Sequence, residues 1–415
     1  MNQIEQLGFS ARAAARVLAT ASTSQKNRAL EFIRAGLLEN TDEILAANQL
    51  DIQNAEKDGM KKAFTDRLLL TRARIEGIAA AVAEVIALPD PIGEAISMAN
   101  RPNGLTVANV RVPLGVIGII FESRPNVTVD AAVLCLKSGN ACILRGGKEA
   151  INSNIALSNV MRRALEKAGL PAGAVGLVTD ATRQSADDMM TARGILDLLI
   201  PRGGGGLIDA VVAKAKVPVI ETGKGNCHIY VDSAADLEMA VRLTQNAKCS
   251  RPSVCNACET LLVARPVADS FLKLLRPEML SSGVELRADP EALEIIGDAA
   301  IPAQESDWQA EYDDLILAVK VVSGLGEAIE HIEKYSTHHS ETIVTGDYSA
   351  ARRFVNEVDS AAVYVNASTR FTDGGELGLG AEIGISTQKL HARGPMGLRE
   401  LTSNKYIIYG DGQVR

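Results

Sequence analysis

Hydrophobic spacing divides the chain into a helical first part and an alternating remainder. Residues 5–88 are rich in Ala, Leu, Arg and Glu, with apolar positions at helical spacing, which predicts several helices. Examples of these positions are Ala29, Ile33, Leu37 and Leu38. From Pro113 onward, short apolar runs alternate with amphipathic stretches, which predicts βαβ units and a parallel, doubly wound sheet. The expected fold class is therefore α/β.

The same pattern places the boundaries of the expected elements. Strands are predicted at 105–113, 116–121, 141–144, 175–178, 195–200, 217–221, 229–231, 260–264, 315–322, 342–345, 362–366 and 404–409. Helices are predicted at 128–137, 153–168, 237–247, 267–275, 326–335 and 349–358. The segment 371–395 is rich in glycine, so we expect either a tail that reaches another subunit or a surface loop.

Length and charge narrow the class of protein. A chain of 415 residues is too long for one ordinary core, so we expect two or more domains. The net charge of -8 disfavours nucleic acid or an anionic membrane as the main partner, although a local cluster of Arg and Lys can still bind an anionic substrate. We expect no signal peptide, because no basic and apolar leader opens the sequence, and no apolar run approaches the ~20 residues that span a bilayer.

Cysteine and histidine usage favours a reducing, cytoplasmic setting without a metal. The six cysteines form no regular framework, so reduced thiols are expected. Cys255 and Cys258 form a Cys-x-x-Cys pair, but there is no second pair and the closest histidine, His228, lies well upstream. We therefore expect neither a zinc site nor a redox dithiol.

Cys255 is the strongest candidate for chemistry. It lies in a polar, proline-containing connection between a predicted helix and a predicted strand, where a side chain can be both held and exposed. A thiolate is the best nucleophile a protein has near neutral pH, and we expect Lys248 and Arg251 to lower the pKa of this thiol. The alternative, a small buried apolar residue, fits the polar setting less well. The pattern predicts a catalytic nucleophile.

Further candidates follow the ends of predicted strands. Arg145 and Lys148 come after the strand 141–144, at the end where open sheets bind ligands, and two cations there suit a ribose phosphate. Gly203 and Gly204 open a predicted helix, where glycines let the backbone approach a phosphate. A basic surface loop and a flexible turn are the respective alternatives.

Two polar residues also stand at strand ends. Glu221 suits either a base or a structural hydrogen-bond acceptor. Asn126 suits either a donor to a developing oxyanion or a helix cap just before Thr128.

Taken together and in order, these segments resemble a known family. The strings are Pro113-Leu114-Gly115-Val116, Phe121-Glu122-Ser123-Arg124-Pro125-Asn126, Glu221-Thr222-Gly223-Lys224-Gly225-Asn226-Cys227-His228 and Ser250-Arg251-Pro252-Ser253-Val254-Cys255-Asn256. They are similar to motifs of the aldehyde dehydrogenase superfamily across almost the whole chain, and more narrowly to those of its γ-glutamyl phosphate reductase family.

The resemblance implies an aldehyde-dehydrogenase-like fold and an activity. A parallel-sheet, Rossmann-type nicotinamide cofactor domain is expected at 1–104 and 125–223, and an α/β catalytic domain at 224–366. A small bridging or oligomerisation element is expected at 105–124 and 367–415. The implied reaction is NADPH-dependent reduction of L-glutamyl 5-phosphate to L-glutamate 5-semialdehyde, through a thioester on Cys255, in proline biosynthesis. A homo-oligomer is also implied, and docking of a glutamate 5-kinase is left open.

The resemblance also implies roles for the catalytic and substrate-binding residues. The Cys255 backbone N–H and Asn126 are expected to stabilise an oxyanion, although Asn126 is offset from the family's usual position. Arg124 is expected to meet the leaving phosphate or the substrate carboxylate, and Arg251 to meet that carboxylate.

The cofactor roles are implied in the same way. Arg145, Gly203 and Gly204 are expected to lie at the cofactor. Lys148 replaces an acid that contacts a ribose hydroxyl in other members, which favours a 2′-phosphate and thus NADPH. Glu221 takes the place of the base of hydrolytic members, so it is either structural or a contact to the nicotinamide ribose. Glu311 matches a second ribose-contacting glutamate by position.

Three other functions stay open at this point. A hydrolytic aldehyde dehydrogenase stays possible because Glu221 takes the place of the base of hydrolytic members. Dependence of the reaction on phosphate would distinguish the reductase from it. A cofactor-free cysteine acyl hydrolase lacks a histidine in a recognisable partnering motif. A non-catalytic binding or scaffold protein is excluded only by an assay.

Overall fold

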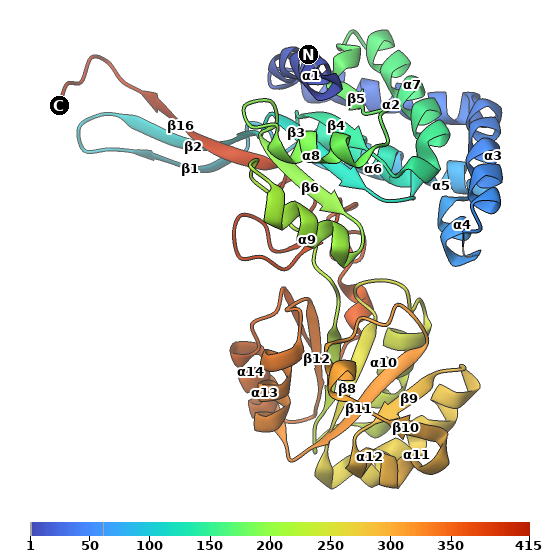
Figure 1. Cartoon of the computed structure of the whole chain (residues 1–415). Helices are drawn as coiled ribbons and strands as arrows, with labels where there is room; N and C mark the ends of the chain where they lie inside the picture. Colours follow the sequence, from blue (N-terminus) through green and yellow to red (C-terminus); the bar gives the residue numbers. More distant parts are fainter. Residues whose placement is uncertain (1, 61) are drawn as a thin grey trace.

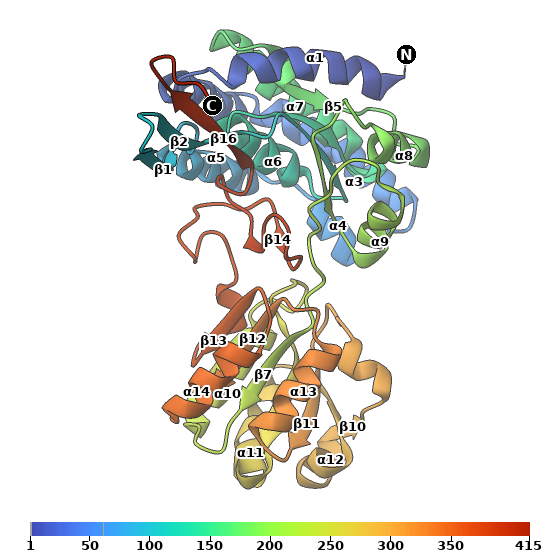
Figure 2. The ribbon, with the colours of Figure 1, turned by 90° about the vertical axis from the view of Figure 1, so that its left-hand side faces the viewer.

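The computed structural model describes residues 2–60 and 62–415, which form two α/β lobes and a projecting arm. The lobes are stacked, and the chain passes between them at a narrow waist (Figures 1 and 2). We call the part that carries β3 to β6 the first lobe and the part that carries β7 to β13 the second lobe. Within the described residues no helix is long and apolar enough to cross a membrane.

The first lobe is built on a four-stranded parallel sheet in the order β5-β4-β3-β6. Its strands are β3 (Val116–Phe121), β4 (Ala141–Arg145), β5 (Val175–Leu177) and β6 (Leu198–Arg202). Every residue of β3 is buried, because helices pack on both faces of this central strand. Both α1 (Gln3–Leu18) and α6 (Pro125–Lys137) contact β3 and β4.

Helices make up the rest of the first lobe. They are α2 (Thr23–Glu39), α3 (Thr41–Lys57), α4 (Lys62–Leu68), α5 (Arg72–Ala87), α7 (Ile151–Lys167), α8 (Arg183–Thr191) and α9 (Gly205–Lys214). The helical spacing in the first part of the chain is confirmed, since Ala29, Ile33 and Leu37 of α2 are buried on one face, whereas Leu38 is exposed.

The second lobe holds a seven-stranded, fully parallel sheet in the order β10-β9-β11-β8-β7-β12-β13. Its strands are β7 (Cys227–Val231), β8 (Cys258–Ala264), β9 (Glu285–Ala288), β10 (Ala300–Pro302), β11 (Ile316–Val322), β12 (Ser340–Val344) and β13 (Ala362–Val365). Its helices are α10 (Leu237–Cys249), α11 (Arg265–Ser281), α12 (Pro290–Ile296), α13 (Leu325–Tyr335) and α14 (Tyr348–Glu357). The amino ends of the parallel strands β7 and β8 face the waist and their carboxyl ends point away from it. Cys255, in the connection that precedes β8, is therefore brought to the waist.

The arm is an antiparallel sheet of β1 (Ala95–Asn100), β2 (Thr106–Pro113) and β16 (Thr402–Tyr409). It projects from the side of the first lobe (Figure 1). This arrangement corrects the bridging element expected at 105–124, because β3 pairs with β4 and β6 in the first lobe and the arm segment ends at Pro113. The strand β1 was not predicted, since all six of its residues are exposed and carry no burial pattern.

One predicted strand is also wrong. The segment 217–221 forms only an isolated bridge between Val219 and Leu199 at the edge of the sheet. The glycine-rich segment 371–395 returns from the second lobe to the first and carries two-residue strands β14 (Ile385–Ser386) and β15 (Gly394–Pro395). It therefore lies along this chain's own waist, where Gln388 accepts a hydrogen bond from the Glu221 backbone N–H at 2.7 Å.

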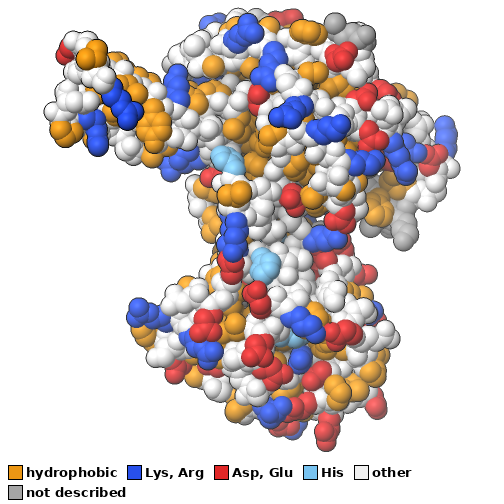
Figure 3. All heavy atoms as spheres, turned by 60° about the vertical axis from the view of Figure 1, so that its left-hand side comes forward, with side chains coloured by type: hydrophobic (Ala, Val, Ile, Leu, Met, Phe, Trp, Pro, Cys, Tyr) orange, Lys and Arg blue, Asp and Glu red, His pale blue; other side chains and the backbone are white. Residues whose placement is uncertain are grey.

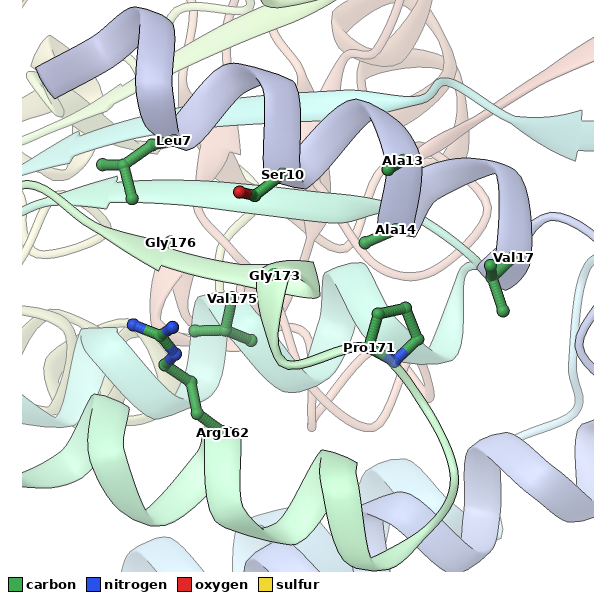
Figure 4. A pocket seen from close by; sticks show the side chains of 10 residues that line it. All are labelled: Leu7, Ser10, Ala13, Ala14, Val17, Arg162, Pro171, Gly173, Val175 and Gly176. Carbon is green, nitrogen blue, oxygen red and sulfur yellow. The ribbon is translucent and has the colours of Figure 1, made fainter. Parts of the chain in front are cut away.

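A cavity of about 330 Å³ lies on the far side of the first lobe, between α1 and β5 (Figure 4). Its lining is mostly apolar, with Arg162 at one side and Ser10 as a polar group. None of the predicted site residues lines this cavity.

Candidate active site

Cys255 lies in a tight turn at the waist. The turn is closed by a hydrogen bond of 3.0 Å from the Ala257 N–H to the Val254 carbonyl, which makes Cys255 the first of its two central residues. The turn connects the end of α10 to the start of β8. Cys255 is half-buried as a residue, so the turn holds it at the waist rather than inside either core.

The returning tail fixes this turn from one side. The Asn256 side-chain amide donates to the Thr372 carbonyl at 2.9 Å, and the Thr369 hydroxyl donates to the Asn256 carbonyl at 2.7 Å. Arg370 adds a guanidinium bond to the Asn256 side chain and another to the Ser250 hydroxyl at 3.1 Å. The position of the nucleophile therefore depends on residues more than 110 positions further along the chain.

The strand entering the second lobe fixes the turn from the other side. The Cys227 thiol donates to the Cys255 carbonyl at 3.1 Å and lies 3.6 Å from Nδ1 of His339. Gly225 lies so close to the Cys255 backbone that any side chain would collide with it. The Gly225 N–H donates to the Glu311 carboxylate at 2.9 Å.

The electrostatic surroundings of Cys255 differ from those predicted. Burial raises the pKa of the Cys255 thiol to about 11, and Arg202 is the strongest group that opposes this rise. Lys248 is not a leading influence on Cys255; it is buried, paired with Glu259 at 2.6 Å, and lowers the pKa of Cys258 instead. The prediction that Lys248 lowers this pKa is therefore wrong. Lys248 is close to Cys255 in sequence, but its side chain points into the core of the second lobe.

Arginines from both lobes gather around Cys255. Burial lowers the pKa of Arg124, and the positive charges of Arg202, Arg67 and Arg251 lower it further, while Cys255 raises it. Burial likewise lowers the pKa of Arg370; the charge of Arg251 lowers it further, whereas Cys255 raises it. The structure thus brings the predicted Arg124 and Arg251 together. It adds Arg202 and Arg370, which sequence reasoning missed.

Acidic groups complete the site. Burial raises the pKa of Glu382 to about 7 and that of Asp130 to about 6, while Arg202 lowers both. Burial also raises the pKa of Glu311. The site therefore combines a thiol, several cations and carboxyls that titrate near neutral pH, which is the charge pattern of a catalytic cleft rather than of a plain surface.

Asn126 is the second residue of α6, close to the end of β3. Its side-chain amide donates to the Asp130 carboxylate at 2.9 Å. An amide nitrogen carries two protons, so one stays free for another acceptor. Pro125 at the first position of the helix explains why α6 begins three residues before the predicted start.

Four of the predicted cofactor residues, Arg145, Lys148, Gly203 and Gly204, follow the carboxyl ends of the first lobe's strands, whereas Glu221 lies in the linker and Glu311 in the second lobe. Gly204 is the N-cap of α9, and the glycines Gly204 and Gly206 are not needed for packing, because a Cβ at Gly206 would meet open space and one at Gly204 only Glu122 at 3.7 Å. The backbone is thus open at Gly204 and Gly206, where a phosphate can approach the N–H groups, whereas the Glu122 side chain covers Gly203 and the Lys224 side chain covers Gly205. These residues fit a dinucleotide.

Arg145 and Lys148 have different surroundings. The Arg145 guanidinium donates to the carbonyls of Ala181 and Thr182 at 3.0 Å each, so part of its donor capacity is used to hold this loop. Lys148 is exposed and borders a cavity of about 280 Å³ with Lys57, Asp58 and Glu149. The two cations, which sequence reasoning treated as a pair, therefore make different contacts.

Known proteins give the context for this geometry. The family model described as "Aldehyde dehydrogenase family" matches residues 2–293. The chain belongs to the aldehyde dehydrogenase family. It is 58% identical over 415 residues to a γ-glutamyl phosphate reductase of Carboxydothermus hydrogenoformans, with both chains fully covered. A γ-glutamyl phosphate reductase of Heliobacterium modesticaldum is 57% identical over 414 residues, covering all of this chain and 99% of the relative.

A solved structure supports the same placement. The crystal structure of γ-glutamyl phosphate reductase from Thermotoga maritima matches with a TM-score of 0.98 and 50% identity, covering all of both chains. The aldehyde-dehydrogenase-like α/β fold and the resemblance predicted from the motifs are therefore confirmed. Membership of the aldehyde dehydrogenase family also makes the chain an oxidoreductase that acts on a small molecule with a nicotinamide cofactor.

Proposed function

We propose that the chain is an NADPH-dependent γ-glutamyl phosphate reductase that converts L-glutamyl 5-phosphate into L-glutamate 5-semialdehyde and phosphate in proline biosynthesis. The observation that carries this proposal is a half-buried thiol, Cys255, faced by arginines from both lobes. A substrate with a phosphoryl group at one end and a carboxylate at the other needs several cations around one nucleophile. Relatives of the same length and above 55% identity carry the corresponding name.

The chemistry follows from the thiol. The Cys255 thiolate attacks the acyl carbon, the carbon–oxygen bond to phosphate breaks, and phosphate leaves with the electron pair. When bound, the reduced nicotinamide supplies the hydride that converts the acyl group into the aldehyde. Collapse of the adduct returns the thiolate of Cys255, and one proton from solvent is taken up by the phosphate.

The backbone N–H of Cys255 and the free amide proton of Asn126 are the proposed oxyanion donors. Loss of one such donor typically adds ~3 kcal/mol to a barrier. Arg124 and Arg251 are proposed to bind the substrate. Glu221 is proposed to hold the linker through its backbone bond to Gln388 and to contact the nicotinamide ribose together with Glu311.

The cofactor residues proposed are Arg145, Lys148, Gly203 and Gly204, with Glu221 and Glu311 near the ribose. The exposed Lys148, joined at its cavity by Lys57, supports NADPH over NADH, because a 2′-phosphate needs cations. Asp58 and Glu149 line the same cavity, so the preference for NADPH depends on how these two carboxylates and the two lysines act together on a 2′-phosphate.

The arm supports a homo-oligomer. Its exposed apolar residues are Ile96, Met98, Tyr406, Ile408 and Tyr409. A projecting sheet with unpaired outer strands and such side chains is typical of a surface that a second copy covers. Light scattering at several concentrations would test this proposal.

Two further proposals concern the cellular setting. All six cysteines are free thiols, which supports the cytoplasm. The acyl phosphate is labile, so we also propose that a glutamate 5-kinase docks to deliver it, which co-elution of the two enzymes would test.

The decisive experiment is NADP reduction with L-glutamate 5-semialdehyde, with and without inorganic phosphate. Steady turnover that requires phosphate is expected. Turnover without phosphate would instead favour the hydrolytic aldehyde dehydrogenase, the rival kept by Glu221. A cofactor-free acyl hydrolase or a scaffold protein predicts no change in nicotinamide absorbance at all.

A further inference from the structure

We propose that Arg202 holds the phosphoryl group of the acyl phosphate in the reductive direction and the incoming inorganic phosphate in the reverse direction. This assignment rests on the proposed function and concerns the same site. By binding phosphate next to the thioester, Arg202 favours phosphate over water as the group that attacks the acyl carbon.

Arg202 has the right place in the fold. It is the last residue of β6 and pairs with Phe121, the last residue of β3. Arg124 follows Phe121 by three residues, so two guanidinium groups leave neighbouring strand ends of the first lobe. Ligands bind at this edge of open α/β sheets, and the waist places it opposite the turn of Cys255 (Figure 3 shows the narrow waist).

Arg202 is also a cation without a partner. It is half-buried, yet among the described residues no hydrogen bond and no ion pair reaches its guanidinium group. Half-buried arginines elsewhere in the fold are paired, such as Arg12 with Asp197 at 2.9 Å and Arg287 with Asp307 at 2.7 Å, whereas Arg124 beside Cys255 shares with Arg202 the lack of a partner among the described residues. Because removing an unpaired charge from water is costly, this contrast indicates an anion that arrives with the substrate.

The neighbours of Arg202 define where that anion lies. Its charge lowers the pKa of Cys255, Asp130 and Glu382, which belong to three separate segments of the chain. Its NH1 atom lies 3.5 Å from the position of a Cβ at Gly384, in the returning tail. Among the described residues neither carboxyl forms an ion pair with Arg202; Asp130 accepts a hydrogen bond from the Asn126 amide and Glu382 accepts one from the Gly374 N–H.

The chemistry needs a planar cation at this point. As the sulfur–carbon bond forms and the carbon–oxygen bond breaks, negative charge gathers on the phosphate oxygens. A guanidinium fork donates two parallel hydrogen bonds to such oxygens, and an ammonium group cannot reproduce them. Arg370 is less suited, because its bonds to Ser250 and Asn256 already hold the turn.

The test uses Arg202→Lys, which keeps the charge that acts on Cys255 but removes the fork. With L-glutamate 5-semialdehyde and NADP, we expect the KM for inorganic phosphate to rise about tenfold or more. The KM for the aldehyde should change by less than about twofold. A single-turnover burst of NADPH without phosphate should persist, because acylation of Cys255 precedes phosphate attack.

Arg251→Lys is the matched control, and it should raise the KM for the aldehyde while leaving that for phosphate unchanged. Protection of Cys255 from iodoacetamide by inorganic phosphate gives a readout independent of turnover, and Arg202→Lys should need about tenfold more phosphate for the same protection. An unchanged phosphate KM or an unchanged protection curve in Arg202→Lys overturns the assignment. If the unaltered enzyme turns over steadily without phosphate, the proposed function itself fails.

Discussion

The α-carbon of Gly225 is packed against the backbone of Cys255. A Cβ at position 225 would stand 1.5 Å from the Cys255 carbonyl oxygen and 2.2 Å from its carbonyl carbon. These contacts are with backbone, which cannot rotate away, so the whole turn must shift to admit a methyl group. The Gly-x-Gly of the linker therefore sets how closely the segment between the lobes approaches the nucleophile.

Gly225→Ala is expected to lower kcat by about 100-fold, because a displacement of ~1 Å at a reacting group can cost that much. The protein should still fold, since Gly225 lies in the linker rather than in either core. Gly326→Ala is the control, because a Cβ there meets nothing within 4 Å. That variant should keep full activity, and equal activity of both variants would contradict the packing argument.

Cys255→Ala should abolish phosphate-dependent reduction of NADP while binding of NADPH persists. The substitution removes the only atom on which the proposed thioester can form. Binding can be followed by nicotinamide fluorescence, and the acyl adduct by mass spectrometry of the intact protein. Cys249→Ala removes another half-buried thiol close in sequence and should remain active. Turnover by Cys255→Ala near the normal rate would exclude a covalent mechanism.

The free enzyme's thiol should react faster as pH rises. Because burial raises the pKa of Cys255 to about 11, the neutral thiol dominates at pH 7 and the thiolate fraction grows up to that pKa. Alkylation by iodoacetamide should therefore accelerate roughly tenfold per pH unit between about pH 7 and pH 9. In Arg202→Met the opposing positive charge is lost, so the rate at each pH should fall. A plateau below about pH 8 would indicate a low thiol pKa instead.

A strand can be predicted from this sequence when its own residues carry a hydrophobic pattern, and not when it depends only on pairing with distant residues. The strand β3 was predicted because six consecutive residues are apolar and all are buried. The strand β1 was missed because none of its residues is buried, so its pairing with β2 leaves no trace in the hydrophobic pattern. The segment 217–221 shows the opposite error. Its apolar residues predict a strand, but it lies beside β6 with only the isolated bridge at Val219.

The site divides in the same way. Cys255 was found because its polar connection is a local feature of the sequence. Arg202 was missed because its importance comes from the approach of two lobes, although its place directly after the buried residues of β6 was a usable signal. Lys248 was misassigned because nearness along the chain does not give direction, and the inward face of α10 turns it toward Glu259.

The buried pair of Lys248 and Glu259 should be sensitive to removal of one partner. Both side chains have no exposed surface and lie 2.6 Å apart. Lys248→Met leaves a carboxyl buried without its cation, which typically costs about 3–5 kcal/mol in the free energy of unfolding. The double variant Lys248→Met with Glu259→Leu should recover most of this loss, as urea unfolding would show. Arg72→Met, at an exposed pair with Asp42, should cost less than about 1 kcal/mol.

Lys148→Glu should reverse the cofactor preference. The exposed ammonium group of Lys148 lies at the cavity it shares with Lys57, and a carboxylate there repels a 2′-phosphate but accepts hydrogen bonds from the ribose hydroxyls of NADH. The ratio of kcat/KM for NADPH to that for NADH should fall by at least about tenfold, with kcat for NADH retained. Lys57→Ala removes the second cation without adding an acid and should give a smaller change in the same direction. Because Asp58 and Glu149 border the cavity in every variant, a ratio unaffected by both substitutions would place the adenosine end of the cofactor elsewhere.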